Sequence, residues 1–273
     1  MTGLNCAVCG DPGRPEILLL HGFMGSATDW RGIIAALEGE HRCLAVDLPG
    51  HGSSLGLPPD AYTIEGTARA LLNLLDGLEI IRPTLVGYSM GGRLALYLAL
   101  RHPERSSGLF LESASPGIED PAERRERRRA DEERAGRLEL GDLASFLDDW
   151  YRQPLFASLA RREEVLEETI GARLRNDPRE LARSLRGMGA GRTPSLWGEL
   201  AALRMPALAV AGERDERYVG ISARMAARSP RVRAAVVPEA GHNVRLENPE
   251  EYLAALKSFL ERGAKGVLRF LGS

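Results

Sequence analysis

The sequence predicts an α/β fold in which a mostly parallel, doubly wound sheet carries an inserted helical cap. Apolar runs of strand length alternate with helical patterns up to about residue 115, which is typical of parallel strands joined by crossover helices. The alternation stops over residues 116–203, where only helical patterns are found, and it resumes at residue 204. We therefore expect residues 1–115 and 204–273 to form the core and residues 116–203 to form the cap.

The expected strands and helices follow one another in a regular order. Continuous apolar runs such as residues 16–20 indicate strands that are buried on both faces of a parallel sheet. Before the cap, we expect strands over residues 4–10, 16–20, 43–47, 84–87 and 108–112 and helices over residues 26–37, 63–75 and 91–101. After the cap, we expect strands over residues 206–212 and 234–237 and helices over residues 219–228 and 249–262.

The composition is that of an ordinary globular protein. The chain has 273 residues, 44% of them hydrophobic, and a net charge of −2, which suits one large domain with an insertion and gives no reason to expect a nucleic-acid partner. No apolar run approaches the roughly 20 residues that span a bilayer, so no stable membrane insertion is expected. We expect a cytoplasmic protein that is a monomer or a small homo-oligomer.

Cys6 and Cys9 have the spacing of metal ligands, but no second Cys/His pair accompanies them. They also fall on a predicted strand. We therefore interpret them as structural cysteines and expect no metal site.

The sequence Gly87-Tyr88-Ser89-Met90-Gly91 lies between a predicted strand and a predicted helix. Glycines on both sides of the serine remove the β-carbons that would collide where the strand and the helix approach each other. Such a turn projects Ser89 at the carboxyl edge of the sheet. Because this pattern is common, a simple glycine-rich turn is the alternative, and a catalytic serine needs a histidine and an acid from elsewhere in the chain.

Asp215 and His242 supply these two groups. Each falls just after a predicted strand, and therefore at the same sheet edge as Ser89. The histidine can take the serine's proton, and the acid fixes the tautomer of the histidine. Since an aspartate or a histidine in a loop is common, the prediction of a catalytic triad depends on the joint placement of all three residues.

The loop His21-Gly22-Phe23-Met24-Gly25 follows a central strand, so its backbone N–H groups can face Ser89. We predict an oxyanion hole formed by the backbone N–H groups of Phe23 and Met90. His21 and His51 lie in loops near this site, where shaping the loops is the more conservative role for them than proton transfer.

Arginines require separate treatment because they are numerous. The run from Arg124 to Arg129 is interleaved with acidic residues, which indicates a solvated helix face with salt bridges. Arg93 differs, because it lies in the first turn of the helix that follows Ser89. An arginine near the pocket can hold a carboxylate through two hydrogen bonds, which suggests an anionic substrate.

Four segments resemble the 2-succinyl-6-hydroxy-2,4-cyclohexadiene-1-carboxylate synthases of menaquinone biosynthesis, which are lyases with the α/β-hydrolase fold. These segments are GYSMGGR at residues 87–93, DWYRQPLF at residues 149–156, RLRN at residues 173–176 and GERD at residues 212–215. The chain order of serine, aspartate and histidine is also that of α/β hydrolases. The loops at residues 21–23, 47–52 and 241–242 are shared by many α/β hydrolases and do not identify the synthases.

The resemblance implies a set of substrate-binding residues. Its substrate is a small molecule with three carboxylates, and no metal or organic cofactor takes part. By this resemblance, the substrate would be bound by Arg93, Arg127 and Arg173, with Tyr88, Trp150 and Phe156 around them. Arg124 and Arg128 are the alternatives to Arg127 within the arginine-rich run.

The implied reaction eliminates pyruvate from 2-succinyl-5-enolpyruvyl-6-hydroxy-3-cyclohexene-1-carboxylate to give 2-succinyl-6-hydroxy-2,4-cyclohexadiene-1-carboxylate. Ser89, made basic through His242 and Asp215, would remove a proton from carbon. A serine carboxylesterase or thioesterase that acts on a small anionic ester is the alternative, and it would form an acyl-serine and consume water. A non-enzymatic ligand-binding protein is a third interpretation, but it would have no physical need for an intact triad.

Overall fold

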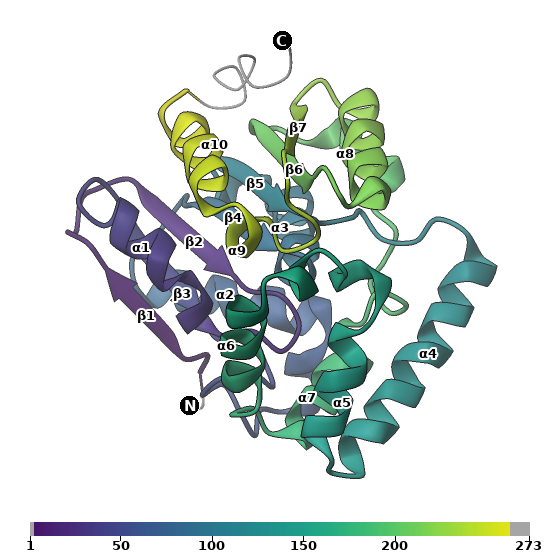
Figure 1. The fold of residues 1–273 in the computed structure, drawn as a ribbon. Coiled ribbons are helices and arrows are strands. Elements are labelled where there is room, and N and C mark those ends of the chain that lie inside the picture. Colours follow the sequence, from purple (N-terminus) through teal and green to yellow (C-terminus); the bar gives the residue numbers. More distant parts are fainter. Residues whose placement is uncertain (1–2, 263–273) are drawn as a thin grey trace.

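A seven-stranded sheet with the strand order β1-β3-β2-β4-β5-β6-β7 forms the centre of the protein (Figure 1). The computed structural model describes residues 3–262. The strands are β1 (Cys6–Cys9), β2 (Glu16–Leu20), β3 (Arg42–Val46), β4 (Thr84–Tyr88), β5 (Gly108–Glu112), β6 (Ala207–Gly212) and β7 (Val232–Val237). Only the outermost strand β1 pairs antiparallel, with β3, and all other pairs are parallel. The predicted α/β fold with a mostly parallel sheet is confirmed.

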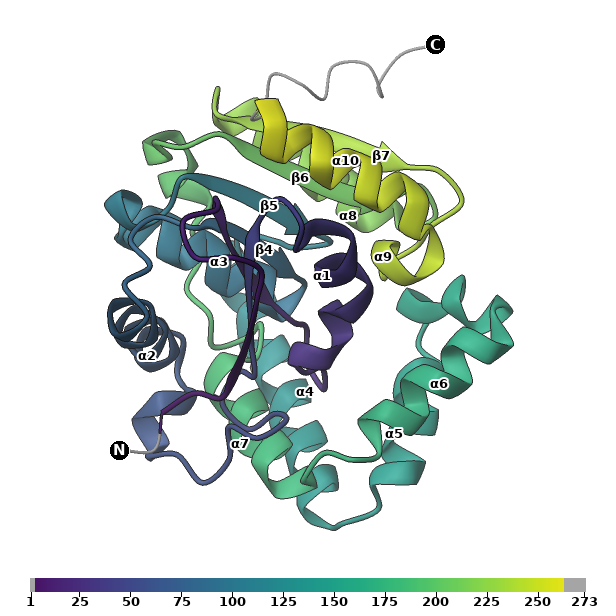
Figure 2. The same ribbon diagram turned by 90° about the vertical axis from the view of Figure 1, so that its left-hand side faces the viewer.

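Helices cover both faces of this sheet (Figure 2). One face packs against α1 (Arg31–Leu37) and α10 (Pro249–Arg262), and the other against α2 (Ile64–Gly77), α3 (Met90–Arg101) and α8 (Glu216–Arg228). This two-sided cover follows from the strands, whose successive side chains point to opposite faces. No helix within residues 3–262 is both long and apolar enough to cross a membrane.

Several element boundaries differ from the predicted ones. Strand β1 is shorter than the predicted residues 4–10, and β7 begins two residues before position 234. Helix α8 begins at Glu216 rather than at residue 219, because the side chain of Asp215 accepts a hydrogen bond from the Tyr218 N–H and so caps the helix. The short helix α9 (Val244–Glu247) was not predicted.

Between the neighbouring strands β5 and β6 the chain makes a helical excursion, which we call the helical segment (residues 116–203). It contains α4 (Pro121–Glu139), α5 (Leu143–Tyr151), α6 (Glu163–Arg173) and α7 (Pro178–Met188), which lie together beside the sheet (Figure 1). Its apolar side chains form a cluster of their own, which also includes Met24 from the loop after β2. We propose that this segment acts as a cap with the predicted boundaries.

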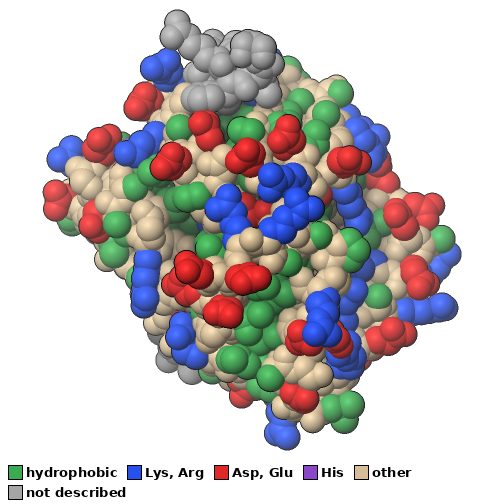
Figure 3. Space-filling model, in the orientation of Figure 1, with side chains coloured by type: hydrophobic (Ala, Val, Ile, Leu, Met, Phe, Trp, Pro, Cys, Tyr) green, Lys and Arg blue, Asp and Glu red, His purple; other side chains and the backbone are tan. Residues whose placement is uncertain are grey.

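The surface of the helical segment carries basic and acidic side chains in close alternation (Figure 3). Ion pairs join Arg137 to Asp149, and Arg186 to both Glu132 and Glu139. These pairs balance part of the arginine charge on this surface locally, as expected for a solvated helix face.

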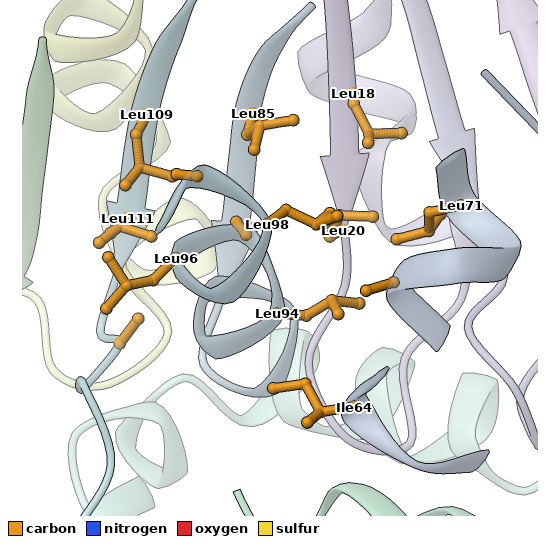
Figure 4. Packing of buried hydrophobic residues seen from close by; sticks show 14 of the residues in the cluster. Leu18, Leu20, Ile64, Leu71, Leu85, Leu94, Leu96, Leu98, Leu109 and Leu111 are labelled. Carbon is orange, nitrogen blue, oxygen red and sulfur yellow. The ribbon is translucent and has the colours of Figure 1, made fainter. Parts of the chain in front are cut away.

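The apolar face of α3, the helix that follows Ser89, packs against the sheet (Figure 4). Leu94, Leu96 and Leu98 of this helix are almost fully buried against leucines of the central strands. Those leucines are Leu18 and Leu20 of β2, Leu85 of β4, and Leu109 and Leu111 of β5. The position of the first turn of α3 is thus set by core packing.

Replacing Leu94 by alanine should lower the free energy of unfolding by about 2–5 kcal/mol, because it leaves a cavity under α3. Chemical denaturation measures the loss. Leu140→Ala is the matched control, since Leu140 is 88% exposed and should give almost no change. Equal effects of the two substitutions would contradict this account of the packing.

Candidate active site

Ser89 lies at the sharp turn between β4 and α3, where its backbone adopts a strained conformation. Its φ of 50° and ψ of −104° place it in a region that residues other than glycine rarely occupy. A β-carbon on Gly91 would lie 2.2 Å from the carbonyl oxygen of Leu20, and one on Gly87 would lie 2.6 Å from that of Gly91. Only glycines permit this close approach of strand and helix, which presents the serine hydroxyl at the carboxyl edge of the sheet.

Three side chains form a chain of hydrogen bonds at this edge. The Oγ of Ser89 lies 3.2 Å from Nε2 of His242, and Nδ1 of the same ring lies 2.8 Å from Oδ2 of Asp215. The side chains of His242 and Asp215 are 2% and 6% exposed. This arrangement can move a proton from the serine to the imidazole, with the carboxylate stabilising the imidazolium that forms.

Asp215 is held in place by its second oxygen. Oδ1 accepts the N–H of Tyr218 at 3.3 Å as the cap of α8, which leaves Oδ2 for the imidazole. The ring of Tyr218 packs edge-on against the imidazole with 4.7 Å between the ring centres. The start of α8 therefore positions both the carboxylate and the histidine.

Two loops at the sheet edge are joined by two histidines, each of which accepts a hydrogen bond from a backbone N–H of the other loop. We call this arrangement the clasp. The N–H of Leu48 donates to Nε2 of His21, and the N–H of Met24 donates to Nε2 of His51. The two rings lie 4.9 Å apart and are fully buried. This clasp fixes the loop that contains Phe23, which lines the same pocket as Met90.

The clasp requires both histidines to be neutral, because each Nε2 accepts a hydrogen bond. Burial lowers the pKa of the His51 imidazole well below its ordinary value, and the charges of His21 and Arg173 act in the same direction. Burial also lowers the pKa of His21, although Asp29 and the Gly22 carbonyl oppose the shift.

A pocket opens over Ser89 between the sheet edge and the helical segment. Its aromatic walls bring together Trp150 and Phe156, with 6.2 Å between the ring centres, and Phe156 packs edge-on against His242 at 6.0 Å. The remaining lining is Phe23, Tyr88, Ser89, Met90, Arg93, Arg127, Arg134, Tyr151, Gln153, Leu155, Arg173, Leu185, Gly189, Ala190, Arg217, Tyr218 and Asn243.

All the residues predicted from the sequence to bind substrate line this pocket. Within the arginine-rich run, Arg127 lines it, whereas Arg124 and Arg128 do not. Arg93 is 8% exposed, donates to the carbonyl oxygen of Met188 at 3.1 Å, and has an Nε without a hydrogen-bond partner in the described chain.

Arg173 is placed differently from what its expected role implies. Its Nη1 and Nη2 each donate at 2.7 Å to one oxygen of Asp29, so its guanidinium is already held by a carboxylate. Burial alone raises the pKa of the Asp29 carboxyl, but the charge and hydrogen bonds of Arg173, with the charge of Arg245, lower it below its ordinary value. The pair joins α6 to the 3₁₀ helix η1 (Ala27–Trp30), which contains Asp29.

A second buried ion pair lies behind the histidine. Nη1 of Arg245 donates to Glu112 at 3.1 Å, and its guanidinium carbon lies 4.2 Å from the centre of the Tyr88 ring. Nη2 of Arg245 lies 3.6 Å from Asp29, so the two ion pairs form one network. The network holds α9, directly after His242, against the sheet.

Sequence reasoning missed several pocket residues, including Arg134, Arg217, Tyr218 and Asn243. Two of them could have been predicted from the sequence, since Tyr218 and Asn243 closely follow the predicted Asp215 and His242. Arg134 lies seven positions after Arg127, which places the two on one face of a helix. Neither arginine could be selected by type alone in so arginine-rich a chain.

The site and fold have counterparts among known proteins. Residues 15–249 match the family model described as alpha/beta hydrolase fold, and the chain belongs to this family. It is 34% identical over 251 residues to the 2-succinyl-6-hydroxy-2,4-cyclohexadiene-1-carboxylate synthase of Escherichia coli O1:K1, which covers 92% of this chain and 96% of that protein. Within the fold family, the chain therefore belongs to the 2-succinyl-6-hydroxy-2,4-cyclohexadiene-1-carboxylate synthases.

Two further proteins are similar to this chain over most of its length. The solved structure of MenH from S. aureus has a TM-score of 0.90 and 32% identity, and covers 96% of this chain and 99% of that one. Protein PHYLLO, chloroplastic, from Arabidopsis thaliana is 35% identical over 90% of this chain, which corresponds to only 15% of PHYLLO. The resemblance seen in the short motifs thus extends over almost the whole chain.

The buried neutral histidines predict a loss of stability in mild acid. The folded-state pKa values of His21 and His51 lie below that of an unfolded histidine, about 6.5, so the unfolded chain binds protons that the folded chain excludes. As the pH falls below about 6.5, each histidine should cost up to about 1.4 kcal/mol of unfolding free energy per pH unit, whereas stability is fully present above it. Urea unfolding at several pH values measures this slope.

His51→Gln should reduce the slope, since glutamine keeps an acceptor for the Met24 N–H but does not titrate. His102→Gln is the control, because His102 is only half-buried at the end of α3. If His51→Gln kept the full acid sensitivity, the buried histidine would not be its source.

Proposed function

We propose that this protein is a lyase that eliminates pyruvate from 2-succinyl-5-enolpyruvyl-6-hydroxy-3-cyclohexene-1-carboxylate to give 2-succinyl-6-hydroxy-2,4-cyclohexadiene-1-carboxylate. The observation that carries the proposal is the combination of the Ser89–His242–Asp215 hydrogen-bond chain with a pocket lined by arginines. Membership of the synthase family supports the same reaction. A cytoplasmic location and the oligomeric state stay predictions.

In this proposal, Ser89 acts as the base. Its Oγ takes the ring proton α to the succinyl ketone, while its own proton passes to Nε2 of His242 over the 3.2 Å contact. Asp215 stabilises the resulting imidazolium from the other side of the ring. The serine returns to its neutral form without a covalent bond to the substrate, which is the difference from an esterase.

The enolate that forms needs hydrogen-bond donors at its oxygen. We assign this role to the backbone N–H groups of Phe23 and Met90, which belong to two residues that line the pocket beside Ser89. Met90 is the first residue of α3, where backbone N–H groups lack partners within the helix and the helix dipole favours negative charge. Collapse of the enolate then breaks the bond between the ring carbon and the enolpyruvyl oxygen and leaves the conjugated diene. The leaving enolpyruvate takes up the proton held by the imidazolium of His242, which returns the triad to its starting state, and becomes pyruvate.

The three carboxylates of the substrate need cationic partners. We assign Arg93, Arg127 and Arg173 to them, with Tyr88, Trp150 and Phe156 as the apolar and aromatic surroundings of the ring. The unpaired Nε of Arg93 supports its part in this assignment, because a buried donor without a partner is costly unless a ligand satisfies it.

The purified protein should release pyruvate from the enolpyruvyl precursor and accumulate a diene that absorbs in the ultraviolet. Ser89→Ala should abolish both signals, because no base remains. A coupled pyruvate assay and absorbance of the diene measure the two products independently. Rapid hydrolysis of p-nitrophenyl esters without any action on the precursor would instead identify an esterase.

Arg93→Ala should weaken binding of the anionic substrate by about 1.5–3 kcal/mol, as expected for the loss of hydrogen bonds to a charged group. Steady-state kinetics should show this as a raised KM. Arg129→Ala on the exposed face of α4 is the control and should leave the kinetics unchanged. A normal KM in a folded Arg93→Ala protein would remove Arg93 from the binding site.

A further inference from the structure

Five arginines line the pocket, two more than the family resemblance assigns. They are Arg93, Arg127, Arg134, Arg173 and Arg217, and no acidic side chain from residues 3–262 lines it with them. Each guanidinium carries a full positive charge. The positive charge that a bound anion meets therefore depends on how many of these arginines already form an ion pair with a carboxylate of the protein.

Two carboxylates balance part of the positive charge. Asp29 is bonded to Arg173 through both oxygens. Asp131 lies 2.7 Å from Nε of Arg127 and 3.5 Å from Nη1 of Arg134, so these two arginines share one negative charge.

Arg93 and Arg217 form no ion pair with any residue in the described part of the chain. Counted over the arginines and their ion-pair partners alone, five positive and two negative charges leave a surplus of three, and Asp215, which is bonded to His242 of the lining, adds one more negative charge beside the pocket. The surplus among the arginines is distributed over Arg93, Arg217 and the pair Arg127 and Arg134, while the charge of Arg173 is matched by Asp29.

Arg217 lies at a position where a positive charge does not stabilise the fold. It is the second residue of α8, and a positive charge in the first turn of a helix opposes the helix dipole. Its side chain is exposed, and no carboxylate within residues 3–262 forms an ion pair with it. A residue that breaks a local rule without structural compensation is typical of a functional position.

The neighbours of Arg217 are the groups that would carry out the reaction. Asp215 precedes it by two positions, and the next residue, Tyr218, packs on the imidazole of His242. Arg217, Tyr218 and His242 line the same pocket. A long cationic side chain here can reach an anion bound beside the imidazole.

We propose that Arg217 is a further substrate-binding residue, which holds a carboxylate at the exposed side of the pocket next to His242. This proposal rests on the proposed function, because it assigns one charge of that reaction's substrate. Arg173 then contributes N–H donors to the site but no net charge.

The test compares Arg217→Gln with Arg214→Gln. These arginines lie on either side of Asp215 and are both exposed, but only Arg217 lines the pocket. For pyruvate release from the precursor, Arg217→Gln should raise KM about tenfold, equivalent to about 1.4 kcal/mol, with kcat almost unchanged. It should also weaken the dependence of kcat/KM on salt, and Arg217→Lys should restore part of both. Arg214→Gln should match the wild type.

Calorimetric titration with citrate, a tricarboxylate, provides a readout that does not depend on turnover. Arg217→Gln should weaken citrate binding relative to the wild type and to Arg214→Gln. If the wild type releases no pyruvate but citrate binding still depends on Arg217, the proposed reaction fails and the role of Arg217 in anion binding stands. If the wild type is active and Arg217→Gln has a normal KM and normal citrate binding, the role of Arg217 is overturned and the reaction stands.

Discussion

The close approach of β4 to α3 is the constraint on which the rest of the site depends. It forces Ser89 to a φ of 50°, a conformation that costs on the order of 1–3 kcal/mol and persists only where the surroundings leave no alternative. The leucines of α3 supply those surroundings, since they anchor the helix to the sheet immediately after the turn. This turn and the first turn of α3 supply three groups of the proposed site, namely the hydroxyl of Ser89, the N–H of Met90 and the guanidinium of Arg93.

Features that depend on local sequence could be predicted well. The order of strands and helices follows from apolar runs and their period, and the turn at Ser89 follows from glycines that a close approach requires. Asp215 and His242 could be selected because parallel strands end at the same edge of a sheet. The start of α8 was missed because a catalytic candidate, Asp215, is also the helix cap, and the pattern of apolar residues does not reveal that second role.

Features that depend on pairing between distant side chains could not be predicted. Arg173 and Asp29 are 144 positions apart, and nothing near either residue indicates that they meet. Arg217 was missed for the opposite reason, since its significance lies in having no partner, which only the packed structure reveals. Arginines in this chain look alike in sequence, and their carboxylate partners decide whether each one stabilises the fold or leaves charge for a ligand.

The buried ion network connects the two halves of the proposed site. Arg173 brings α6 to Asp29, and Arg245 ties α9, and with it the loop of His242, to Glu112. Breaking one member of such a buried pair leaves an uncompensated charge, so the network favours one relative placement of the helical segment and the sheet edge. Because Asp29 also lies 3.6 Å from Arg245, a change at Arg173 would alter the field around Arg245, three residues from the imidazole. In the proposed reaction, a change at Arg173 would therefore also act on the surroundings of the imidazole, even though the residues involved come from separate parts of the chain.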